Sequence, residues 1–390
     1  MQVSDRSGGT VRHDDLGAGL VGTALQAMIF ARSSGRWDEA HAAARAVTAR
    51  PLTGHPTQAS LYRGVPALAY ALHLADHPAY ARTRAELAAE TIAIVADRVD
   101  TGLRRMDSGR PPRMAEYDLI SGLTGLGAFL LRSERGRALE RVLHYLVRLL
   151  TEPVTVAGHQ VPGWWAADSP SGTTEHGTFS TGHANLGLAH GMPGPLALLA
   201  LAARAGYSVD GQDKALDEGI TVLTHWAQPH ASGTIGWPGP LPLDTFLAGP
   251  TPATKPQRPS WCYGTPGIGR ALQLAALTRH DDQARQTAEQ AVLDSITDPL
   301  HLTQLSDATV CHGWAGLLLT CDHVAADAKT SGIAHQLPKL RAQLNRHLVQ
   351  HEIPQDAGLL EGNAGVRLTL HTLHTPRPAD LGWETCLLLN

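Results

Sequence analysis

Cysteine is scarce in this chain, with four residues in 390, at positions 262, 311, 321 and 386. Thiols so few and so widely separated cannot staple a chain of this length, which excludes a disulfide-rich scaffold. Metal binding or reactive chemistry is therefore the expected use of these thiols, with a disulfide pair as the alternative.

The chain also lacks an excess of either charge. Its 32 basic and 36 acidic residues give a formal net charge of -4, and Lys and Arg are dispersed along the sequence. No basic patch marks a surface for nucleic acid or for an anionic membrane. A peptide or a small molecule is therefore the expected partner.

Long apolar runs are absent as well. The longest of them, such as 196–203, are too short to cross a bilayer, and the start of the chain has no apolar stretch behind a basic segment. We expect no membrane span and a cytoplasmic location. With 43% hydrophobic and 17% charged residues, the chain still has ample apolar material for a large core.

What the sequence does contain is a glycine unit that recurs along its whole length. Seven units have the form Gly-x-x-Gly, except that the second ends in Ala67. The units are Gly19–Gly22, Gly64–Ala67, Gly122–Gly125, Gly191–Gly194, Gly264–Gly267, Gly313–Gly316 and Gly362–Gly365. Each is followed by an apolar stretch that is poor in charge, such as 196–201 or 317–319. Self-similarity on this scale indicates a repeat architecture.

The spacing of these units predicts the fold. Successive first glycines are 45 to 73 residues apart, which leaves room for two ordinary helices and their connections. The apolar stretches would form an inner ring, and amphipathic stretches such as 82–90 and 284–291 an outer ring. We therefore expect an all-α fold, an α/α toroid of seven helical hairpins forming a single domain over 1–390. The glycine loops would meet at one mouth, where glycine permits close backbone approach.

The glycine register identifies residues that should share the rim of this mouth. Cys262 and Cys311 each precede their glycine by two positions, His312 and His190 by one, and Asp118 by four. At the position just before the glycine, other repeats carry Ala18, Arg63, Ser121 and Glu361. The reactive side chains are thus concentrated in a few repeats, as expected of a catalytic face.

Three of these residues predict a metal site. Zinc binds thiolate and imidazole ligands, and three protein ligands, here Cys262, Cys311 and His312, leave a fourth position for water or substrate. Buried free cysteines more often pack as small hydrophobes, and we assign Cys321 and Cys386 to packing.

The other two rim residues also have alternative interpretations. A lone histidine such as His190 is usually structural or exposed. Asp118 could merely cap the helix that follows it, because Asp is a preferred residue at helix N-termini. Their shared position on the rim with the three metal-ligand candidates favours a functional role for both.

Four motifs surround these residues. They are Asn185–Gly194 (NLGLAHGMPG), Arg258–Gly264 (RPSWCYG), Cys311–Gly313 (CHG) and Tyr117–Gly122 (YDLISG). Together they resemble the lanthionine synthetase cyclases, the LanC family. The resemblance implies an α/α toroid and a single zinc ion per chain bound by Cys262, Cys311 and His312. It also implies active-site roles for the four residues Asp118, His190, Arg258 and Tyr263.

The resemblance also implies a reaction. A zinc-dependent lanthipeptide cyclase adds Cys thiolates to dehydroalanine or dehydrobutyrine in a dehydrated precursor peptide, forming thioether rings. His190 would act as acid and base, Asp118 would orient it or raise its pKa, and Arg258 would hold the enolate oxygen or pair with Asp118. The length matches the stand-alone cyclases, so a separate dehydratase is expected. A monomer is the expected state.

Three alternatives remain open from the sequence. A LanC-like enzyme could add glutathione or another thiol to dehydroamino acids with the same zinc site. A zinc prenyltransferase on a similar toroid would need an aromatic-lined tunnel, which an aromatic content of 5% disfavours. A non-catalytic scaffold of a peptide-modification complex would not need the zinc ligands and the Asp118 and His190 pair.

Two segments interrupt the helical pattern. Residues 229–259 contain eight prolines and form a predicted loop or small insertion, which could be a functionless surface excursion or could cover the mouth. Residues 158–182, with Trp164, Trp165 and His176, could line the entrance. His183 is an additional polar group there but not a predicted ligand.

Overall fold

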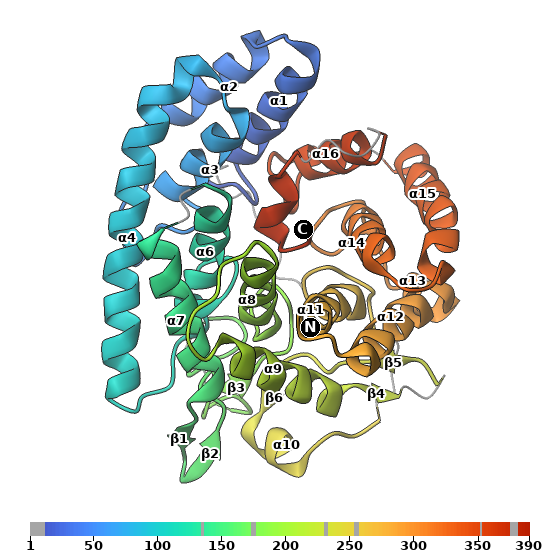
Figure 1. Ribbon diagram of the computed structural model, residues 1–390. Helices are drawn as coiled ribbons and strands as arrows, with labels where there is room; N and C mark the ends of the chain where they lie inside the picture. Colours follow the sequence, from blue (N-terminus) through green and yellow to red (C-terminus); the bar gives the residue numbers. More distant parts are fainter. Residues whose placement is uncertain are drawn as a thin grey trace.

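Two concentric rings of helices make up the architecture of the computed structural model (Figure 1). The structure describes residues 12–133, 136–172, 177–229, 233–252, 257–351, 353–374 and 381–390. Within them, the inner ring contains α1 (Leu20–Ser34), α3 (Val65–Ala75), α6 (Leu123–Arg132), α8 (Pro193–Arg204), α11 (Thr265–Arg279), α14 (Trp314–Asp327) and α16 (Asn363–His374). The outer ring contains α2 (Asp38–Thr48), α4 (Ala81–Asp107), α7 (Arg137–Thr151), α9 (Gln212–Trp226), α12 (Asp282–Thr297) and α15 (Gly332–Gln350). The expected all-α toroid is confirmed.

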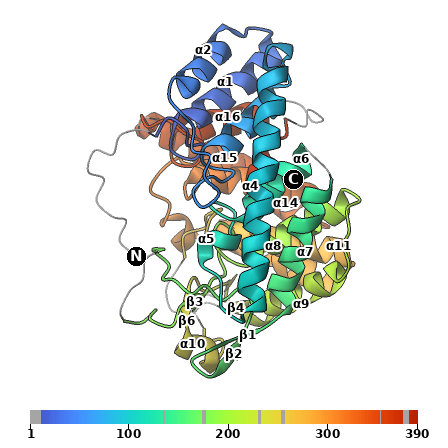
Figure 2. The same cartoon turned by 90° about the vertical axis from the view of Figure 1, so that its left-hand side faces the viewer.

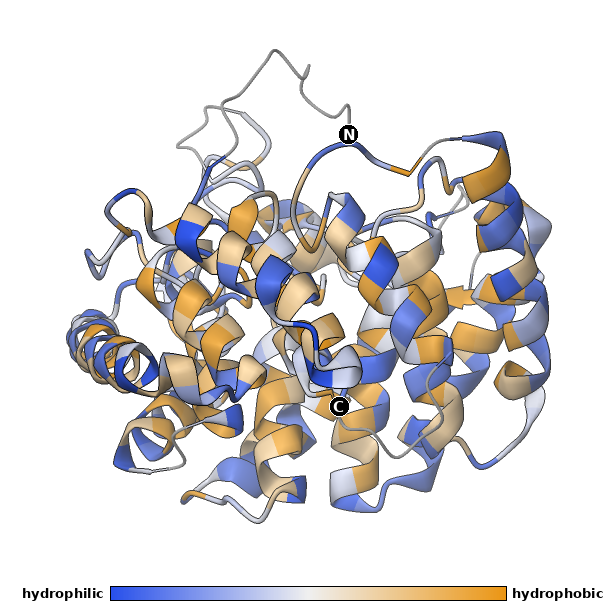
Figure 3. Cartoon of the chain, turned by 90° about the horizontal axis from the view of Figure 1, so that it is seen from above, coloured by the Kyte–Doolittle hydropathy of each residue, from blue (hydrophilic) through white to orange (hydrophobic). Residues whose placement is uncertain are grey.

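The two rings differ in how their helices bury apolar surface. Helix α8 is apolar on all sides and is buried over nearly its whole length between its neighbours. Helix α7 is amphipathic and buries one face, which includes Leu139, Leu143 and Leu146. Figure 3 shows this pattern along the rings, with hydrophobic positions between the helices and hydrophilic positions turned outward. The outer helix α4, 27 residues long, runs across the outside of the ring (Figure 2).

Glycine is required where an inner helix begins against the loop that precedes it. A Cβ atom on Gly316 would lie 1.8 Å from the carbonyl oxygen of Val310, and one on Gly267 would lie 1.9 Å from that of Trp261. Real Cβ atoms never approach this closely, so any other residue would push the helix away from the loop. The glycine unit thus holds each of these loops against the start of its own helix.

The last repeat departs from the expected hairpin. After α16, the next described segment is not an outer helix but the short 3-10 helix η2 (Trp383–Leu387), and residues 381–389 are all buried. This segment enters the centre of the ring (Figure 1). Tyr70 Oη on α3 donates to the carbonyls of Gly382 and Trp383 at 2.9 and 3.0 Å. The C-terminal residues therefore fill the middle of the toroid and join its inner helices.

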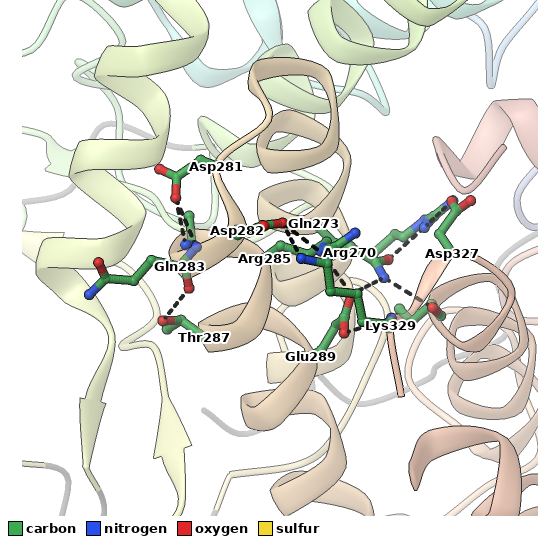
Figure 4. Close-up of polar contacts among 12 residues, drawn as sticks. Arg270, Gln273, Asp281, Asp282, Gln283, Arg285, Thr287, Glu289, Asp327 and Lys329 are labelled. Carbon is green, nitrogen blue, oxygen red and sulfur yellow. Dashed lines mark hydrogen bonds and ion pairs between the residues drawn. The ribbon is translucent and has the colours of Figure 1, made fainter. Parts of the chain in front are cut away.

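A polar network around Arg270 fixes the end of this C-terminal plug, residues 381–389, and Figure 4 shows how Arg270, Gln273, Glu289 and Asp327 lie within it. Arg270 donates to the carbonyl oxygen of Leu389 at 2.7 Å and forms an ion pair with Asp327 at 2.8 Å. Its neighbour Gln273 accepts from Arg270 and donates to Glu289 at 3.2 Å. Helices α11, α12 and α14 are thereby joined to the C-terminus, and the buried guanidinium is fully partnered, as its desolvation requires.

Short elements decorate the ring. They are η1 (Pro78–Tyr80), α5 (Met114–Tyr117), β1 (Val154–Val156), β2 (His159–Val161), β3 (His183–Ala184), β4 (Gln228–Pro229), β5 (Ile235–Gly236), β6 (Leu241–Pro242), α10 (Leu243–Ala248) and α13 (Pro299–Leu302). The strands form three antiparallel pairs, β1 with β2, β3 with β6, and β4 with β5. In the first, Thr155 lies opposite Gln160.

The proline-rich segment contributes some of these short elements. Its described residues include β5, β6 and α10. The ring centroid of Phe246, on α10, lies 5.5 Å from that of Trp165 and 5.6 Å from that of Trp226. Trp164 and Trp165 are buried in the core and do not line the entrance. His176 lies outside the described residues. Within the part of the chain that the structure covers, no helix is long and apolar enough to cross a membrane.

Candidate metal centre and active site

Main-chain hydrogen bonds between repeats build the rim on which the candidate residues lie. Four residues each donate the backbone N–H to the backbone carbonyl oxygen of a residue in the next repeat. The pairs are Leu119 to Ala189, Ala189 to Cys262, Cys262 to Cys311, and Cys311 to Leu360. The four distances are between 2.9 and 3.2 Å. All but Leu119 lie two positions before their glycine. Equivalent positions of consecutive repeats are therefore hydrogen-bonded neighbours, which is why the glycine register could place them together.

Arg98 of helix α4 bridges the rim between the second and third repeats. Its Nη1 donates to the carbonyls of Ala59 at 3.0 Å and Ser121 at 2.6 Å, and its Nη2 donates to Ala115 at 2.7 Å. A single guanidinium with five donors suits this role, because it can satisfy several fixed carbonyls at once. The sequence pattern did not identify this residue.

Cys262, Cys311 and His312 form the one cluster among the described residues that could hold a metal ion. One ligand atom from each residue lies within 4.8 Å of the other two. Cys262 is buried, and the other two are partly buried. Two thiols and an imidazole are the donor set that zinc prefers. The Oγ of Ser260 lies 3.7 Å from the Cys262 sulfur, within reach of a hydroxyl-to-sulfur hydrogen bond.

The charges of this cluster suit a cation. Hydrogen bonds from Cys311 and His312 hold the pKa of Cys262 well below its ordinary value, despite burial. The same interaction raises the pKa of Cys311 well above its ordinary value, because Cys311 supplies the proton that stabilises the neighbouring thiolate. A metal ion replaces such protons when it binds, since thiolate and neutral imidazole are the ligating forms.

Asp307 lies behind the candidate ligand His312. Its Oδ2 is 3.2 Å from Nε2 of His312, and its Oδ1 accepts from the Thr309 amide at 2.8 Å and hydroxyl at 2.6 Å. The hydrogen bond to Asp307 is the main cause that raises the pKa of His312 to about 9. Burial alone would raise the pKa of Asp307, but its hydrogen bonds from His312 and Thr309 lower it below the ordinary value.

Sequence reasoning missed Asp307. Carboxylates that orient a metal-binding histidine through its second ring nitrogen are a common feature of metal sites. The signal that could have found it is the Asp307-x-Thr309 turn immediately before Cys311, because Asp side chains in such turns bind the amide two residues on.

Asp118, which is buried, and His190, whose side chain is 29% exposed, form a pair close to the cluster. His190 Nδ1 lies 2.6 Å from Asp118 Oδ2, and Asp118 is 1% exposed. Burial alone would lower the pKa of His190, but the hydrogen bond to Asp118 and the nearby Cys262 sulfur raise it. Asp118 also accepts from the Ser121 amide at 2.6 Å, so it fixes the turn before α6 as well.

Arg258 does not pair with Asp118. Its side chain is partly buried, and among the described residues no hydrogen bond or ion pair joins it to this carboxylate. Instead, the charge of Asp118 acts on the partly buried Arg98, whose pKa is lowered by desolvation and partly restored by that carboxylate. Of the two roles expected for Arg258, the pairing with Asp118 is therefore wrong, and contact with a substrate oxygen stays a prediction.

Tyr263 follows the candidate ligand Cys262 in the chain and lies beside His190. Its ring centroid is 6.0 Å from that of His190, and burial raises the pKa of Tyr263 to about 12. A Cβ on Gly187 would come within 2.4 Å of the tyrosine ring, so glycine is needed there for the ring to fit. The phenol therefore stays protonated near neutral pH and can donate a hydrogen bond.

A hydrogen-bond chain with a single direction ends on Tyr263. His183 Nδ1 must donate to the Asp168 carbonyl, at 2.7 Å, so His183 Nε2 can only accept. Asn185 Oδ1 accepts from the Gly187 amide at 3.0 Å, so its Nδ2 group faces His183 at 3.3 Å and the oxygen of Tyr263 at 3.2 Å. Tyr263 therefore accepts from Asn185, and its own O–H proton is left for another acceptor.

The roles of His183 and Asn185 were not apparent from the sequence alone. His183 is fully buried, and burial lowers its pKa, consistent with the neutral imidazole that the chain requires. Asn185 begins the NLGLAHG motif, and its polar side chain within an otherwise apolar run is the signal that could have identified it.

Cys321 and Cys386 take no part in this site. Both are buried free thiols, and burial raises the pKa of Cys386 to about 12 and that of Cys321 further. Thiols held protonated in this way are inert. Their assignment to packing fits this burial.

Comparisons with known proteins agree with this arrangement. The family model "Lanthionine synthetase C-like protein" matches residues 10–388. The nisin biosynthesis protein NisC of Lactococcus lactis subsp. lactis is 24% identical over 259 residues, which cover 65% of this chain. The match spans only 60% of that relative's length.

A solved structure, of nisin cyclase, matches with a TM-score of 0.77 and 21% identity over 98% of this chain and 93% of that one. A likeness at this identity supports the toroid fold. The family itself follows from the family model, which covers nearly all of the chain. The chain belongs to the lanthionine synthetase C-like protein family.

Proposed function

We propose that this protein is a zinc-dependent lanthipeptide cyclase, which adds Cys thiols to dehydroalanine or dehydrobutyrine within a dehydrated precursor peptide. The observation that carries the proposal is the placement of the Cys262, Cys311 and His312 cluster beside the Asp118 and His190 pair. Membership of the family and the names of its relatives support the same reaction.

Cys262, Cys311 and His312 would hold one zinc ion. Since Nε2 of His312 faces Asp307, Nδ1 is the ring nitrogen left for the ion. When bound, zinc would lower the pKa of a substrate thiol, so that thiolate is available near neutral pH. Asp307 would fix the orientation of the imidazole, and the rim hydrogen bond between Cys262 and Cys311 would fix the spacing of the two sulfurs.

His190 would move the protons of the reaction. Addition of a thiolate to the β-carbon forms a carbon–sulfur bond and leaves negative charge on the α-carbon and its carbonyl oxygen. A proton must then reach the α-carbon, and the raised pKa of His190 favours the imidazolium that can supply it. Because Nδ1 is bound to Asp118, Nε2 is the nitrogen that would transfer the proton.

Tyr263 and Arg258 would stabilise the charge on the enolate oxygen. The chain through Asn185 leaves the Tyr263 proton free to be donated, and hydrogen bonds aimed at developing charge contribute strongly in a water-poor site. In this scheme Asn185 is a positioning residue that acts through Tyr263. Arg258 would contribute a second donor.

The remaining assignments follow from the reaction. The substrate would come from a separate dehydratase, the protein would act as a monomer, and the location would be the cytoplasm.

The test is incubation with a dehydrated peptide that contains Cys. Ring closure consumes one thiol for each ring without changing the peptide mass, so thiol counting and mass spectrometry together identify it. A parallel incubation with glutathione and a Cys-free dehydrated peptide measures intermolecular addition, which increases the mass. Thiol loss at constant mass supports the cyclase. Efficient mass gain with glutathione and no ring closure would instead support a thiol-adding enzyme. The absence of both reactions would support a non-catalytic scaffold.

A further inference from the structure

A groove lies where the inner and outer rings meet near the start of α14. It has a volume of about 490 Å³ and lies between α13, the start of α14 and the second half of α15. Figure 1 shows these three helices side by side. Trp314, which lines the groove, follows the candidate ligand His312 by two residues. A chain bound in the groove would therefore lie close to the candidate site.

The two walls of the groove differ in character. One wall is apolar and includes Leu302, Leu305 and Trp314. The other is a stripe on α15 that contains Lys339, Gln343, Arg346, His347 and Gln350. These positions recur at intervals of three and four residues, so they share one face of the helix. The groove thus combines an apolar wall with a basic wall.

No acidic side chain lines this groove, and none occurs anywhere in α15, Gly332–Gln350. Among the described residues, neither Lys339 nor Arg346 forms an ion pair, although Arg346 donates to Gln343 at 3.0 Å. Asp307, which lies behind the candidate ligand His312, is already bound to His312 and Thr309. In a chain with a net charge of -4, these two cations are left to face the groove.

Stabilisation of the helix does not account for the whole stripe. Basic residues in the last turn of a helix interact favourably with its dipole, but the effect fades within that turn. His347 meets this condition, whereas Arg346 precedes the last turn and Lys339 lies eleven positions before the end of α15. A ligand that faces the groove is the better explanation for the charge at Lys339.

Exposed apolar side chains lie on the same two helices. Across the described residues, Leu247, Leu300 and Val349 are the exposed large hydrophobic side chains. Leu300, on α13, is 59% exposed, and Val349, on α15, is 88% exposed. Leu247 lies elsewhere, on α10. An apolar surface beside a basic stripe is complementary to a peptide that carries both acidic and apolar residues.

We infer that this groove binds an acidic, partly apolar segment of the precursor peptide, outside the part that forms rings. The inference rests on the proposed function and adds a second point of attachment to it. A segment held in the groove would keep the cysteines of the same peptide near the mouth at a high effective concentration. Successive cysteines could then reach the metal centre without release of the peptide.

The direct test uses a fluorescein-labelled synthetic peptide of alternating acidic and apolar residues, with fluorescence anisotropy as the readout. The charge-reversed variant Lys339→Glu/Arg346→Glu should bind this probe about tenfold or more weakly than the wild type. A probe with Gln and Asn in place of Glu and Asp should bind the wild type with a similar loss. The matched control is Arg36→Glu/Arg50→Glu, which reverses two exposed charges on the α1–α2 side and should bind the acidic probe like the wild type.

A kinetic arm distinguishes this inference from the proposed function. When the acidic segment is fused to a dehydrated Cys peptide, the Lys339→Glu/Arg346→Glu variant should raise KM about tenfold and leave kcat unchanged. The unfused peptide should be cyclised equally by both proteins. Equal probe binding by the variant and the wild type, or equal binding of the acidic and neutral probes, would contradict the inference that the groove binds an acidic segment. Failure of every peptide to cyclise would count against the proposed reaction, while probe binding would still be measured.

Discussion

His190 and Asp118 lie 72 residues apart in the chain, yet Nδ1 of the imidazole is 2.6 Å from Oδ2 of the carboxylate. The rim brings them together, since Leu119 donates its amide to the carbonyl of Ala189. Asp118 and His190 are each adjacent in the chain to one of the two residues that form this main-chain hydrogen bond. The geometry of the pair is set by the backbone of the toroid.

The first prediction concerns the pH dependence of activity. Asp118 raises the pKa of His190, so Asp118→Asn should lower that pKa and leave less imidazolium at a given pH. The alkaline limb of kcat should then move to lower pH, and kcat at its optimum should fall about 100-fold or more. A pH–rate profile of both proteins checks this. An unshifted alkaline limb would mean that His190 does not supply the proton.

The same pair affects stability with a defined sign. A histidine whose pKa is higher in the folded than in the unfolded protein stabilises the fold when it is protonated. This stabilisation is complete below the ordinary pKa and is lost as pH rises through the raised pKa. The stability difference between wild type and Asp118→Asn should therefore be larger at about pH 6 than at about pH 9. Urea unfolding at the two pH values provides the comparison.

Asp307 gives a prediction about metal affinity. Asp307→Asn removes the carboxylate that orients His312, so zinc affinity should fall about 10- to 100-fold while the fold is retained. Competition with a chromophoric chelator measures the affinity. The matched control is Asp356→Asn on the neighbouring loop, which should keep wild-type affinity. Unchanged affinity in Asp307→Asn would show that this carboxylate does not support the metal site.

Asn185 gives a prediction about Tyr263. In Asn185→Asp the amide donor becomes an acceptor, so Tyr263 would donate to the new carboxylate instead of to the substrate. We expect kcat to fall about tenfold or more with KM and zinc content unchanged. Adding Tyr263→Phe to this variant should cause little further loss, because both changes remove the same donor. Fully additive losses in this double-mutant cycle would contradict the positioning role.

Much of this organisation could be predicted from the sequence, for a physical reason. Gly267 and Gly316, in the first turns of α11 and α14, are required because a Cβ atom there would lie 1.9 and 1.8 Å from carbonyl oxygens, so the unit is visible as a repeat. The rim bonds then make its register a measure of position in space, which is how Cys262 and Cys311 could be placed together.

Other features depend on information that the pattern does not carry. Asp307 and Asn185 act through the direction of side-chain hydrogen bonds, which spacing does not encode. The C-terminal plug follows no helical period, and its position depends on distant partners such as Tyr70 and Arg270. The pairing of β3 with β6 likewise joins segments far apart in the chain through two residues each.

The plug gives a prediction about stability. Tyr70→Phe removes the hydroxyl that donates to the carbonyls of Gly382 and Trp383 and accepts from the Cys386 amide. Leaving these buried groups without that partner should lower the free energy of unfolding by about 1–3 kcal/mol. Zinc content at low temperature should stay at the wild-type level. An unchanged urea midpoint would show that the plug adds nothing to stability through this residue.

The central claim is that Cys262, Cys311 and His312 hold a zinc ion on which ring formation depends. The most direct test measures zinc by elemental mass spectrometry, together with thiol loss from a dehydrated Cys peptide, in the wild type, Cys311→Ala and Cys321→Ala. We expect one zinc per chain and thiol loss at constant mass in the wild type and in Cys321→Ala, whose thiol is buried and takes no part in the site. Cys311→Ala should lose both. A Cys311→Ala protein that closes rings without zinc would contradict the account.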